Sequence, residues 1–304
     1  MTRIKERFLF CKEQILLIRK RNKIIAHYLD IPAKKNKVNL YEYHPEKMGY
    51  DLYENKPYNL GDYLGGVIIN HMLEKANISI DKEVTCTKHL NSVGSNLFCS
   101  YQDVTVWGSG IMCQPSRSQA FFQKLSRRKL DIRAVRGPLT REILMRYGYN
   151  CPIVYGDPAI LMPFIYNPSV SKQHKYSIIL QFAHERKFRE KHPDERVISM
   201  NTNDYKSVIN EICASEIIYT SSLHGIVLAE AFGVPAVFFR GLRKSIDFKY
   251  RDWYESTGRK DIHFCDSFGE ALETLPPPIP DLSKLQQGLL DTFPYDLWEP
   301  DIKN

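Results

Sequence analysis

The chain has 304 residues and a formal net charge of +7, with 43% of its residues hydrophobic and 25% charged. This composition is ordinary for a globular protein, and the length allows two domains. The sequence has no run of about 18 uncharged apolar residues, which argues against a membrane-spanning helix. Its seven cysteines are scattered and include no C-x-x-C pair. We therefore expect no zinc site and no disulfide framework, and a cytoplasmic protein is the simplest interpretation.

The positive charge predicts an anionic partner. We expect that partner not to be nucleic acid, because the sequence shows no zinc-finger spacing, basic-aromatic repeat or recognition-helix pattern. Residues 1–36 form a basic extension with interspersed apolar residues. This extension is either an interfacial helix at the inner face of the cell membrane or a surface helix docked on the protein's own core. Both interpretations remain open.

Strand and helix patterns alternate along the first half of the chain. Strands are predicted at 38–43, 104–107, 132–135 and 153–155, and helices at 63–75 and 138–147. Pro138 suits the first position of the second helix. The polar stretch 166–175 then marks a predicted domain boundary.

The second half repeats the alternation. Strands are predicted at 176–182, 197–200, 217–219, 234–239 and 262–265, and helices at 205–213, 226–232 and 282–290. Successive β-α-β units favour parallel sheets. The sequence therefore predicts two Rossmann-like α/β domains that face a cleft, as in GT-B enzymes, with the domains at 1–165 and 176–304.

Four turns after predicted strands carry candidate functional residues, because ligands bind beyond the carboxyl ends of parallel strands. In the turn 59–62, Gly61 permits close approach of a ligand, and Asp62 is a candidate base. The alternative for Asp62 is a helix N-cap. In the second turn, Gly108 and Ser109 permit similar approach, or form a plain tight turn.

The other two turns suggest anion binding. Arg136 and Gly137 precede a helix N-terminus and form a candidate anion clamp, with an interdomain salt bridge as the alternative. His224 begins the helix after the strand 217–219. The helix dipole favours neutral imidazole, whereas a bound phosphate favours the charged form that a general acid needs. The alternative is a histidine hydrogen-bonded in the core.

A basic run follows the strand 234–239. It contains Lys244 and Lys249, and either could close on an anion. Lys249 lies between Phe248 and Tyr250, a setting that could direct it inward. The alternative is that the whole run is a solvated face.

Taken in order, six segments resemble the polysaccharide pyruvyl transferase family, and most of all its exopolysaccharide branch. The segments are "NLGDYL", "VWGSGI", "AVRGPLTREIL", "YGDPAILMP", "SSLHGIVLAEAFGVPAV" and "FKYRDWYESTG". The resemblance covers about residues 57 to 260. One departure is Ser222, which stands where some branches carry Arg before the Leu-His pair.

The resemblance implies a GT-B-like enzyme of exopolysaccharide or capsule synthesis. It would move the enolpyruvyl group of phosphoenolpyruvate onto a sugar of a surface glycan or lipid-linked precursor, forming a pyruvate ketal and releasing phosphate. Donor binding in the family uses residues matching Arg136 and His224 and a basic residue near Lys249. We expect the donor on the C-terminal side and the acceptor on the N-terminal side.

These considerations give the expected site residues. His224 and Asp62 are the candidate catalytic residues. The candidate donor-binding residues are Arg136, Gly137, Ser222, Leu223, Gly225, Lys244 and Lys249. The candidate acceptor-binding residues are Asn59, Gly61, Gly108 and Ser109. We expect no metal or cofactor, because fixed positive charge can stabilise the departing phosphate.

Two other functions remain possible. A GT-B glycosyltransferase that uses a nucleotide sugar would share the fold and the basic cleft. It is mildly disfavoured, because no acidic residue stands between Gly233 and Asp247 to bind a ribose. A non-catalytic anion-binding module is the second alternative, and it would bind the donor without releasing phosphate.

Overall fold

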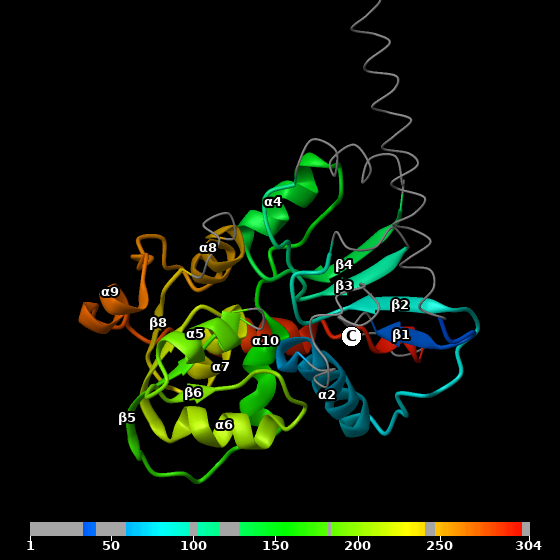
Figure 1. The fold of residues 1–304 in the computed structure, drawn as a ribbon. Helices are drawn as coiled ribbons and strands as arrows, with labels where there is room; N and C mark the ends of the chain where they lie inside the picture. Colours follow the sequence, from blue (N-terminus) through cyan, green and yellow to red (C-terminus); the bar gives the residue numbers. More distant parts are fainter. Residues whose placement is uncertain are drawn as a thin grey trace, which may run out of the picture.

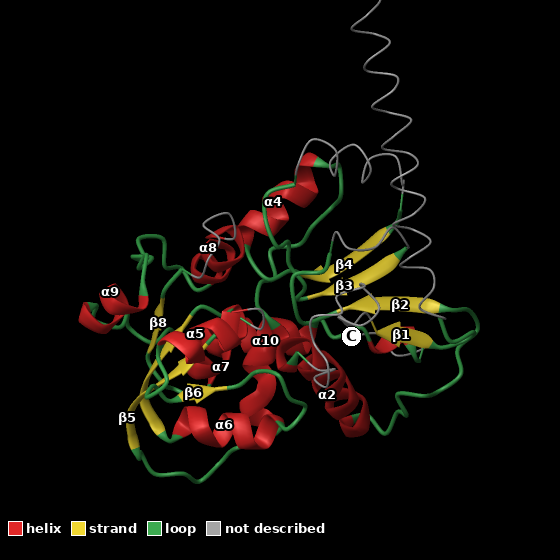
Figure 2. Ribbon diagram, viewed as in Figure 1, coloured by secondary structure: helices red, strands yellow, loops and turns green. Residues whose placement is uncertain are grey.

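The computed structural model of the chain describes residues 33–40, 59–97, 103–115, 128–181, 184–240 and 247–299. Within these ranges the strands form two four-stranded sheets, each parallel throughout (Figures 1 and 2). Helices connect the strands within each half, so the predicted α/β class with parallel sheets is confirmed. The limits 1–165 and 176–304 of the two domains stay predictions.

The first sheet has the strand order β1-β2-β3-β4. Its strands are β1 (Val38–Leu40), β2 (Lys88–Asn91), β3 (Val104–Trp107) and β4 (Leu130–Ala134). All four residues of β3 are buried, as expected for the interior of a parallel sheet. The carboxyl ends of β2, β3 and β4 lead into the turns that carry several of the predicted site residues.

The second sheet has the order β6-β5-β7-β8. Its strands are β5 (His174–Ile179), β6 (Val197–Ile198), β7 (Ser215–Thr220) and β8 (Ala236–Phe238). From β5 the chain crosses to β6 on one side and then to β7 on the other. This reversal places a topological switch point between β5 and β7, where open α/β sheets bind their ligands.

The described helices cover and connect these sheets (Figure 2). They are α2 (Leu60–Lys75), α4 (Pro138–Arg146), α5 (Glu185–Lys191), α6 (Tyr205–Cys213), α7 (Leu223–Ala231), α8 (Asp247–Ser256), α9 (Phe268–Glu273) and α10 (Ser283–Asp291), with 3-10 helices η2 (Pro158–Phe164) and η5 (Tyr295–Leu297). Gly233 follows α7 with a φ of +70°, as the sequence predicts for a residue just past a helix end.

One hydrophobic core runs through both halves. It includes residues of α2 and β3 from the first half and of α6, α7 and α8 from the second. Helix η2 packs against both α2 and α7, and it therefore joins the halves at the centre of the molecule. Its buried residues are Pro158, Ala159, Ile160, Leu161 and Met162.

The C-terminal segment contacts the first half. Trp107 on β3 donates its indole N–H to the carbonyl of Leu289 on α10, over 3.0 Å. Gln286 on the same helix donates to the carbonyl of Ile160, over 2.9 Å. Although the sequence places α10 in the predicted C-terminal domain, its contacts hold it against β3 and η2, between the labelled elements of the two halves (Figure 1).

Several predicted elements have different bounds in the structure. The helix predicted at 63–75 begins one turn earlier, at Leu60, because Asn59 caps it. The strands predicted at 153–155 and 262–265 are reduced to single bridges, Val135 to Tyr155 and Phe239 to Cys265. In both places the segment contacts the edge of a sheet at one residue only, so no ladder forms.

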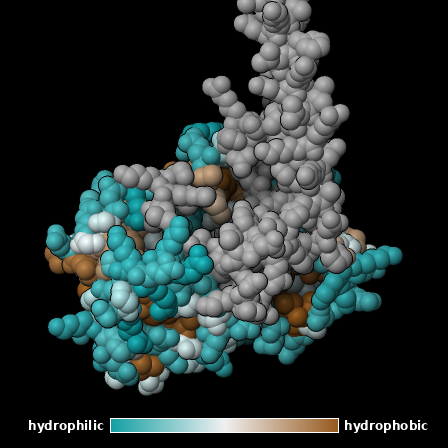
Figure 3. All heavy atoms as spheres, in the orientation of Figure 1, coloured by the Kyte–Doolittle hydropathy of each residue, from teal (hydrophilic) through white to brown (hydrophobic). Residues whose placement is uncertain are grey.

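The described surface is mainly hydrophilic in the view of Figure 3, with a hydrophobic patch over the region of α9 at the left. The exposed large hydrophobic side chains of that region are Leu272, Leu275 and Ile279. None of the described helices combines the length and the apolar character that crossing a bilayer requires.

Candidate active site

Helix α7 begins at the switch point of the second sheet, directly after β7. Its N-cap residue is Ser222, whose hydroxyl caps no α7 backbone N–H within the described residues. The first N–H groups of an α-helix have no partner inside the helix and carry partial positive charge. The N-terminus of α7 is therefore suited to hold an anion.

His224 lies in the first turn of α7, against the first turn of α2. A Cβ atom built on Gly61 would lie 1.8 Å from Nδ1 of His224, so the imidazole occupies the space that a side chain at this position would take. The His224 side chain is 12% exposed. The structure thus brings together two predicted site residues from opposite halves of the chain.

Asp157 is a second neighbour of the His224 ring, and sequence reasoning did not include it among the site residues. Its Oδ1 atom caps η2 by accepting from the N–H of Ala159, over 3.1 Å. Its Oδ2 atom lies 3.7 Å from Nε2 of His224. Oδ2 of Asp157 and Nε2 of His224 are buried, and neither atom has a hydrogen-bond partner among the described residues. A proton on Nε2 would convert this contact into an ion pair.

Asp62 is the third residue of α2 and directly follows the glycine that contacts His224. Asn59 is the N-cap of this helix, accepting from the N–H of Gly61 over 3.3 Å. The alternative interpretation of Asp62 as the N-cap is therefore wrong. Asn59 also donates from Nδ2 to Oδ2 of Asp62, over 2.8 Å. This bond fixes the carboxylate beside the glycine that contacts His224.

The loop after β2 lies against Asp62 at Gly94 and contains buried polar groups. A Cβ atom on Gly94 would lie 2.8 Å from Oδ1 of Asp62, and Gly94 has a φ of +106°. Three side-chain atoms at the end of β2 and in this loop are buried without a partner within the described part of the chain: Nδ2 of Asn91, Oγ of Ser92 and Nδ2 of Asn96. Native proteins rarely leave buried polar groups unpaired, so such a concentration marks a candidate ligand contact. The sequence signal is "NSVGSN" after a strand.

Arg136 is fully buried and already engaged by protein groups. Its Nε atom donates to Oδ2 of Asp252 over 3.1 Å, and its two terminal nitrogens donate to Ser95 and to the carbonyl of Ile111. This ion pair is the salt bridge that the sequence suggested as the alternative to an anion clamp at Arg136. Asp252 also accepts from the backbone N–H and the hydroxyl of Thr140, over 2.9 and 2.6 Å. Its carboxylate therefore occupies the N-terminus of α4.

Lys249, on α8, provides a partly buried ammonium group close to Arg136 and Asp62. Burial, followed by the positive charge of Arg136, lowers the pKa of Lys249 to about 8, while the charge of Asp62 acts in the opposite direction. The Nζ atom lies 5.0 Å from the centre of the Tyr250 ring. Lys249 and Asp62 thus belong to one electrostatic cluster, although they come from different halves of the chain.

The remaining predicted site glycines serve close packing. A Cβ atom on Gly137 would lie 1.9 Å from the carbonyl oxygen of Asp252, and one on Gly225 would lie 2.3 Å from Oγ1 of Thr220. Gly108 has a φ of +82° and lies against Pro158. A larger residue would clash at each of these three positions, and a ligand could contact the glycines only through their backbone N–H and C=O groups.

Two further predicted residues are buried. Leu223 belongs to the core. The hydroxyl of Ser109 lies 2.8 Å from Oδ1 of Asn96 and 3.3 Å from the carbonyl oxygen of Gly94. Ser109 thus braces the loop that follows β2. Lys244 lies outside the described residues. Direct ligand contacts by these residues stay predictions.

Comparison with known proteins gives two sequence matches. An uncharacterised protein of Acanthamoeba polyphaga mimivirus is 24% identical over 200 residues, which are 63% of this chain and 67% of that protein. Residues 97–241 match the family described as polysaccharide pyruvyl transferase. The matched segment runs from the loop after β2 to the end of β8 and includes Arg136, Asp157 and His224. Residues 97–241 therefore form a polysaccharide pyruvyl transferase family domain.

Proposed function

We propose that the chain transfers the enolpyruvyl group of phosphoenolpyruvate to a sugar of a surface polysaccharide or its lipid-linked precursor, forming a pyruvate ketal and releasing phosphate. The observation that carries this proposal is the position of His224. Its imidazole stands in the first turn of α7, against Gly61 of α2 and 3.7 Å from the carboxylate of Asp157. In this proposal, two Rossmann-like units face each other as in GT-B enzymes, with the donor on the C-terminal side.

In this proposal, groups of α7 and α8 bind the negatively charged parts of the donor. The N–H groups at the start of α7 and the ammonium of Lys249 contact the phosphate and carboxylate. Arg136 is fully buried, so it contributes positive charge without contacting the donor directly. Its hydrogen bonds to Ser95 and Ile111 hold the surrounding loops in place. The N-terminus of α4 is already occupied by Asp252. Of the two helix ends that the sequence suggests for anion binding, α7 is therefore the one assigned to the donor.

His224 acts as the general acid. It gives a proton to the terminal methylene carbon of phosphoenolpyruvate, which becomes a methyl group, and the central carbon becomes an oxocarbenium-like electrophile. A positioned acid contributes about 10²–10⁴ in rate. Asp157, whose Oδ2 lies 3.7 Å from Nε2, stabilises the charged ring before transfer.

Asp62 acts as the base for the acceptor. It takes the proton from the sugar hydroxyl that attacks the central carbon, and its carboxylate is held for this role by Asn59. A second hydroxyl of the same sugar attacks the same carbon and gives its proton to the now neutral His224. The phosphate leaves with the donor's bridging oxygen and takes the proton that Asp62 accepted, so both side chains return to their starting states. The unpaired polar groups of Asn91, Ser92 and Asn96 supply hydrogen-bonding capacity for acceptor hydroxyls.

The test incubates the full chain with phosphoenolpyruvate and a panel of glycans. Phosphate release is measured, and mass spectrometry looks for an added pyruvate ketal. His224→Ala should reduce turnover by at least about 10²-fold. The matched control is His174→Ala, at the amino end of β5, which should retain activity. Full turnover by folded His224→Ala would refute the acid assignment.

The two alternative functions give different results in the same preparation. A glycosyltransferase would be stabilised against heat by nucleotide sugars and not by phosphoenolpyruvate. An anion-binding module would be stabilised by phosphoenolpyruvate but would release no phosphate with any acceptor. Either pattern would exclude the proposed transfer reaction.

A further inference from the structure

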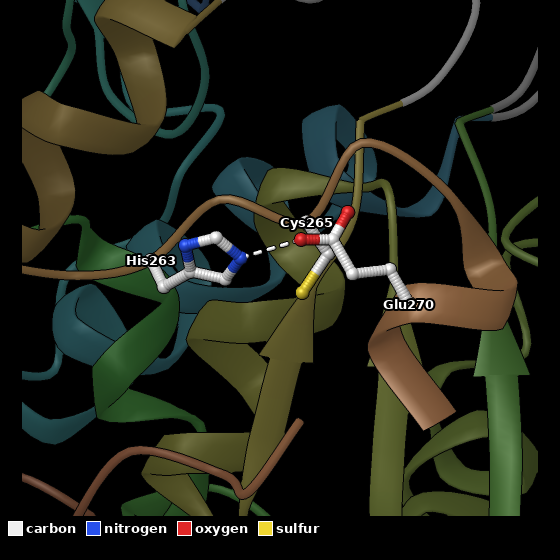
Figure 4. Close-up of side chains that lie close together, drawn as sticks. All are labelled: His263, Cys265 and Glu270. Atoms are coloured by element: carbon white, nitrogen blue, oxygen red, sulfur yellow. Dashed lines mark hydrogen bonds and ion pairs between the residues drawn. The ribbon is translucent and has the colours of Figure 1, made fainter. Parts of the chain in front are cut away.

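Three side chains with metal-binding atoms, none of them assigned to pyruvyl transfer, converge near α9. His263 and Cys265 lie two residues apart near the bridge that joins Cys265 to Phe239, and Glu270 lies on α9. In an extended segment, residues i and i+2 point to the same side. Figure 4 shows the imidazole nitrogen, the thiol sulfur and a carboxylate oxygen turned toward one another, and these atoms all lie within 4.8 Å of each other.

The carboxylate of Glu270 is held in place by its surroundings. Its Oε2 atom accepts from the backbone N–H of Asp266 over 2.6 Å, while its own N–H donates to the hydroxyl of Ser267, over 3.1 Å. Oε1 is thereby turned toward Nε2 of His263, at 2.6 Å. This arrangement resembles a capping box at the start of α9. Such outer hydrogen bonds are what orient a metal ligand before the metal binds.

We propose that His263, Cys265 and Glu270 bind a divalent transition metal ion, zinc in the first instance. A thiolate, an imidazole and a carboxylate together form a ligand set typical of zinc, and a sulfur ligand disfavours magnesium and calcium. Three protein ligands leave one position of a tetrahedral ion for water. The side chains of His263 and Glu270 are 65% and 39% exposed, so water can reach this position.

The proposed ion would strengthen the link between the segment 263–266 and α9. Asp266, beside the cluster, is paired with Arg240, and Arg240 also pairs with Asp247 at the start of α8. Helix α8 carries Lys249. In this proposal the ion stabilises the segment that contacts the edge of the second sheet at Phe239, and through Arg240 the start of α8.

Cobalt(II) is the probe, because a thiolate ligand gives this ion a charge-transfer band in the near ultraviolet. The full chain is treated with a chelator and titrated with cobalt, and the stoichiometry and dissociation constant are measured. One ion per chain with the thiolate band is expected. His263→Ala and Glu270→Gln should weaken binding at least about tenfold, since even loss of an outer-shell partner costs 10–100-fold. The exposed Cys86, changed to Ser, is the matched control and should bind as the unmodified chain does.

Cys265→Ser should bind cobalt without the thiolate band. Because Cys265 is buried, circular dichroism first establishes that this variant is folded, and the exposed His263→Ala variant tests the proposal if it is not. Zinc should also raise the melting temperature of the unmodified chain and of Cys86→Ser, but not of His263→Ala. Absence of cobalt binding, a thiolate band that persists in folded Cys265→Ser, or unchanged affinity in His263→Ala would each overturn the proposal. None of these measurements depends on pyruvyl transfer.

Discussion

Nε2 of His224 and Oδ2 of Asp157 face each other across 3.7 Å, and both atoms are buried. The separation exceeds a hydrogen bond, and neither atom has another partner in the described ranges. Leaving a buried polar atom unpaired costs about 1–3 kcal/mol. A charged imidazole would remove this cost for both atoms at once. The carboxylate of Asp157 is therefore placed to form an ion pair with the imidazolium that the proposed acid requires.

Asp157→Asn tests this relationship without removing the helix cap. An asparagine side chain can still accept from the N–H of Ala159, so η2 should keep its N-terminus. The variant should lose at least about tenfold in kcat, because a neutral amide cannot stabilise the charged ring of His224, and should change the KM for phosphoenolpyruvate little. Phosphate release at saturating donor measures the effect. An unchanged kcat would mean that Asp157 serves only as a cap.

Gly61→Ala should displace the imidazole of His224. A Cβ at this position would lie 1.8 Å from Nδ1, and the ring would have to rotate away. Gly65→Ala is the matched control on the same helix, since its nearest contact would be 3.7 Å, to Val93. Alanine favours a helix at both positions. We expect Gly61→Ala to abolish phosphate release while Gly65→Ala remains active. Equal activity of the two variants would place the reacting groups elsewhere.

The sequence predicts best those elements whose pattern is local. Helix α6 has the predicted bounds because its apolar residues recur at helical spacing and Asp204 caps it. Strand β2 could not be predicted in the same way, because it contains only one apolar residue, Leu90. Its pairing with β1 and β3 makes it a strand. The polar loop that follows β2 was missed together with the strand.

The candidate site shows the same difference between features with a local sequence pattern and features that depend on long-range packing. The turns carrying His224 and Asp62 could be found in the sequence because each follows an apolar strand or begins an apolar helix. Their mutual contact, and the partners Asp157 and Asp252, depend on how the two halves pack. A carboxylate that pairs with a distant residue has no local pattern. For this reason the sequence left open whether Arg136 clamps an anion or forms a salt bridge.

The lowered pKa of Lys249 predicts a change in donor use with pH. As the pH rises through about 8, the ammonium loses its proton and its attraction for the phosphate, so kcat/KM for phosphoenolpyruvate should fall. Lys249→Arg keeps the charge and should remove this alkaline decline. Lys187→Arg, at an exposed position on α5, is the control and should leave it in place. A decline that persists unchanged in Lys249→Arg would assign it to another group.

The lowered pKa of Lys249 also makes the free energy of unfolding depend on pH. Between about pH 8 and the ordinary lysine value of 10.5, the unfolded chain binds more protons at Lys249 than the folded chain does. The free energy of unfolding should therefore rise with pH in this window. Lys249→Gln should be more stable than the unmodified chain at pH 7, and the difference should shrink toward pH 10. Urea unfolding at several pH values measures it, with Lys187→Gln as control. A Lys249→Gln variant less stable than the unmodified chain at pH 7 would contradict the lowered pKa.

Arg136 and Asp252 form a fully buried ion pair, and each should be costly to remove alone. Arg136→Ala or Asp252→Asn leaves a buried group without its charged partner, and we expect a loss of about 3–5 kcal/mol in the free energy of unfolding. Arg196→Ala is the control, because its pair with Glu211 is about 40% exposed and should contribute no more than about 1 kcal/mol.

The double variant Arg136→Met with Asp252→Leu separates the structural role of Arg136 from its role in donor binding. Replacing both charges with apolar groups should recover part of the stability, because no unpaired charge remains, although Thr140 loses its acceptor. If Arg136 also supplies positive charge to the donor site, the KM for phosphoenolpyruvate should stay raised in the folded double variant. An unchanged KM together with recovered stability would limit Arg136 to holding α8 against the loops after β2 and β3.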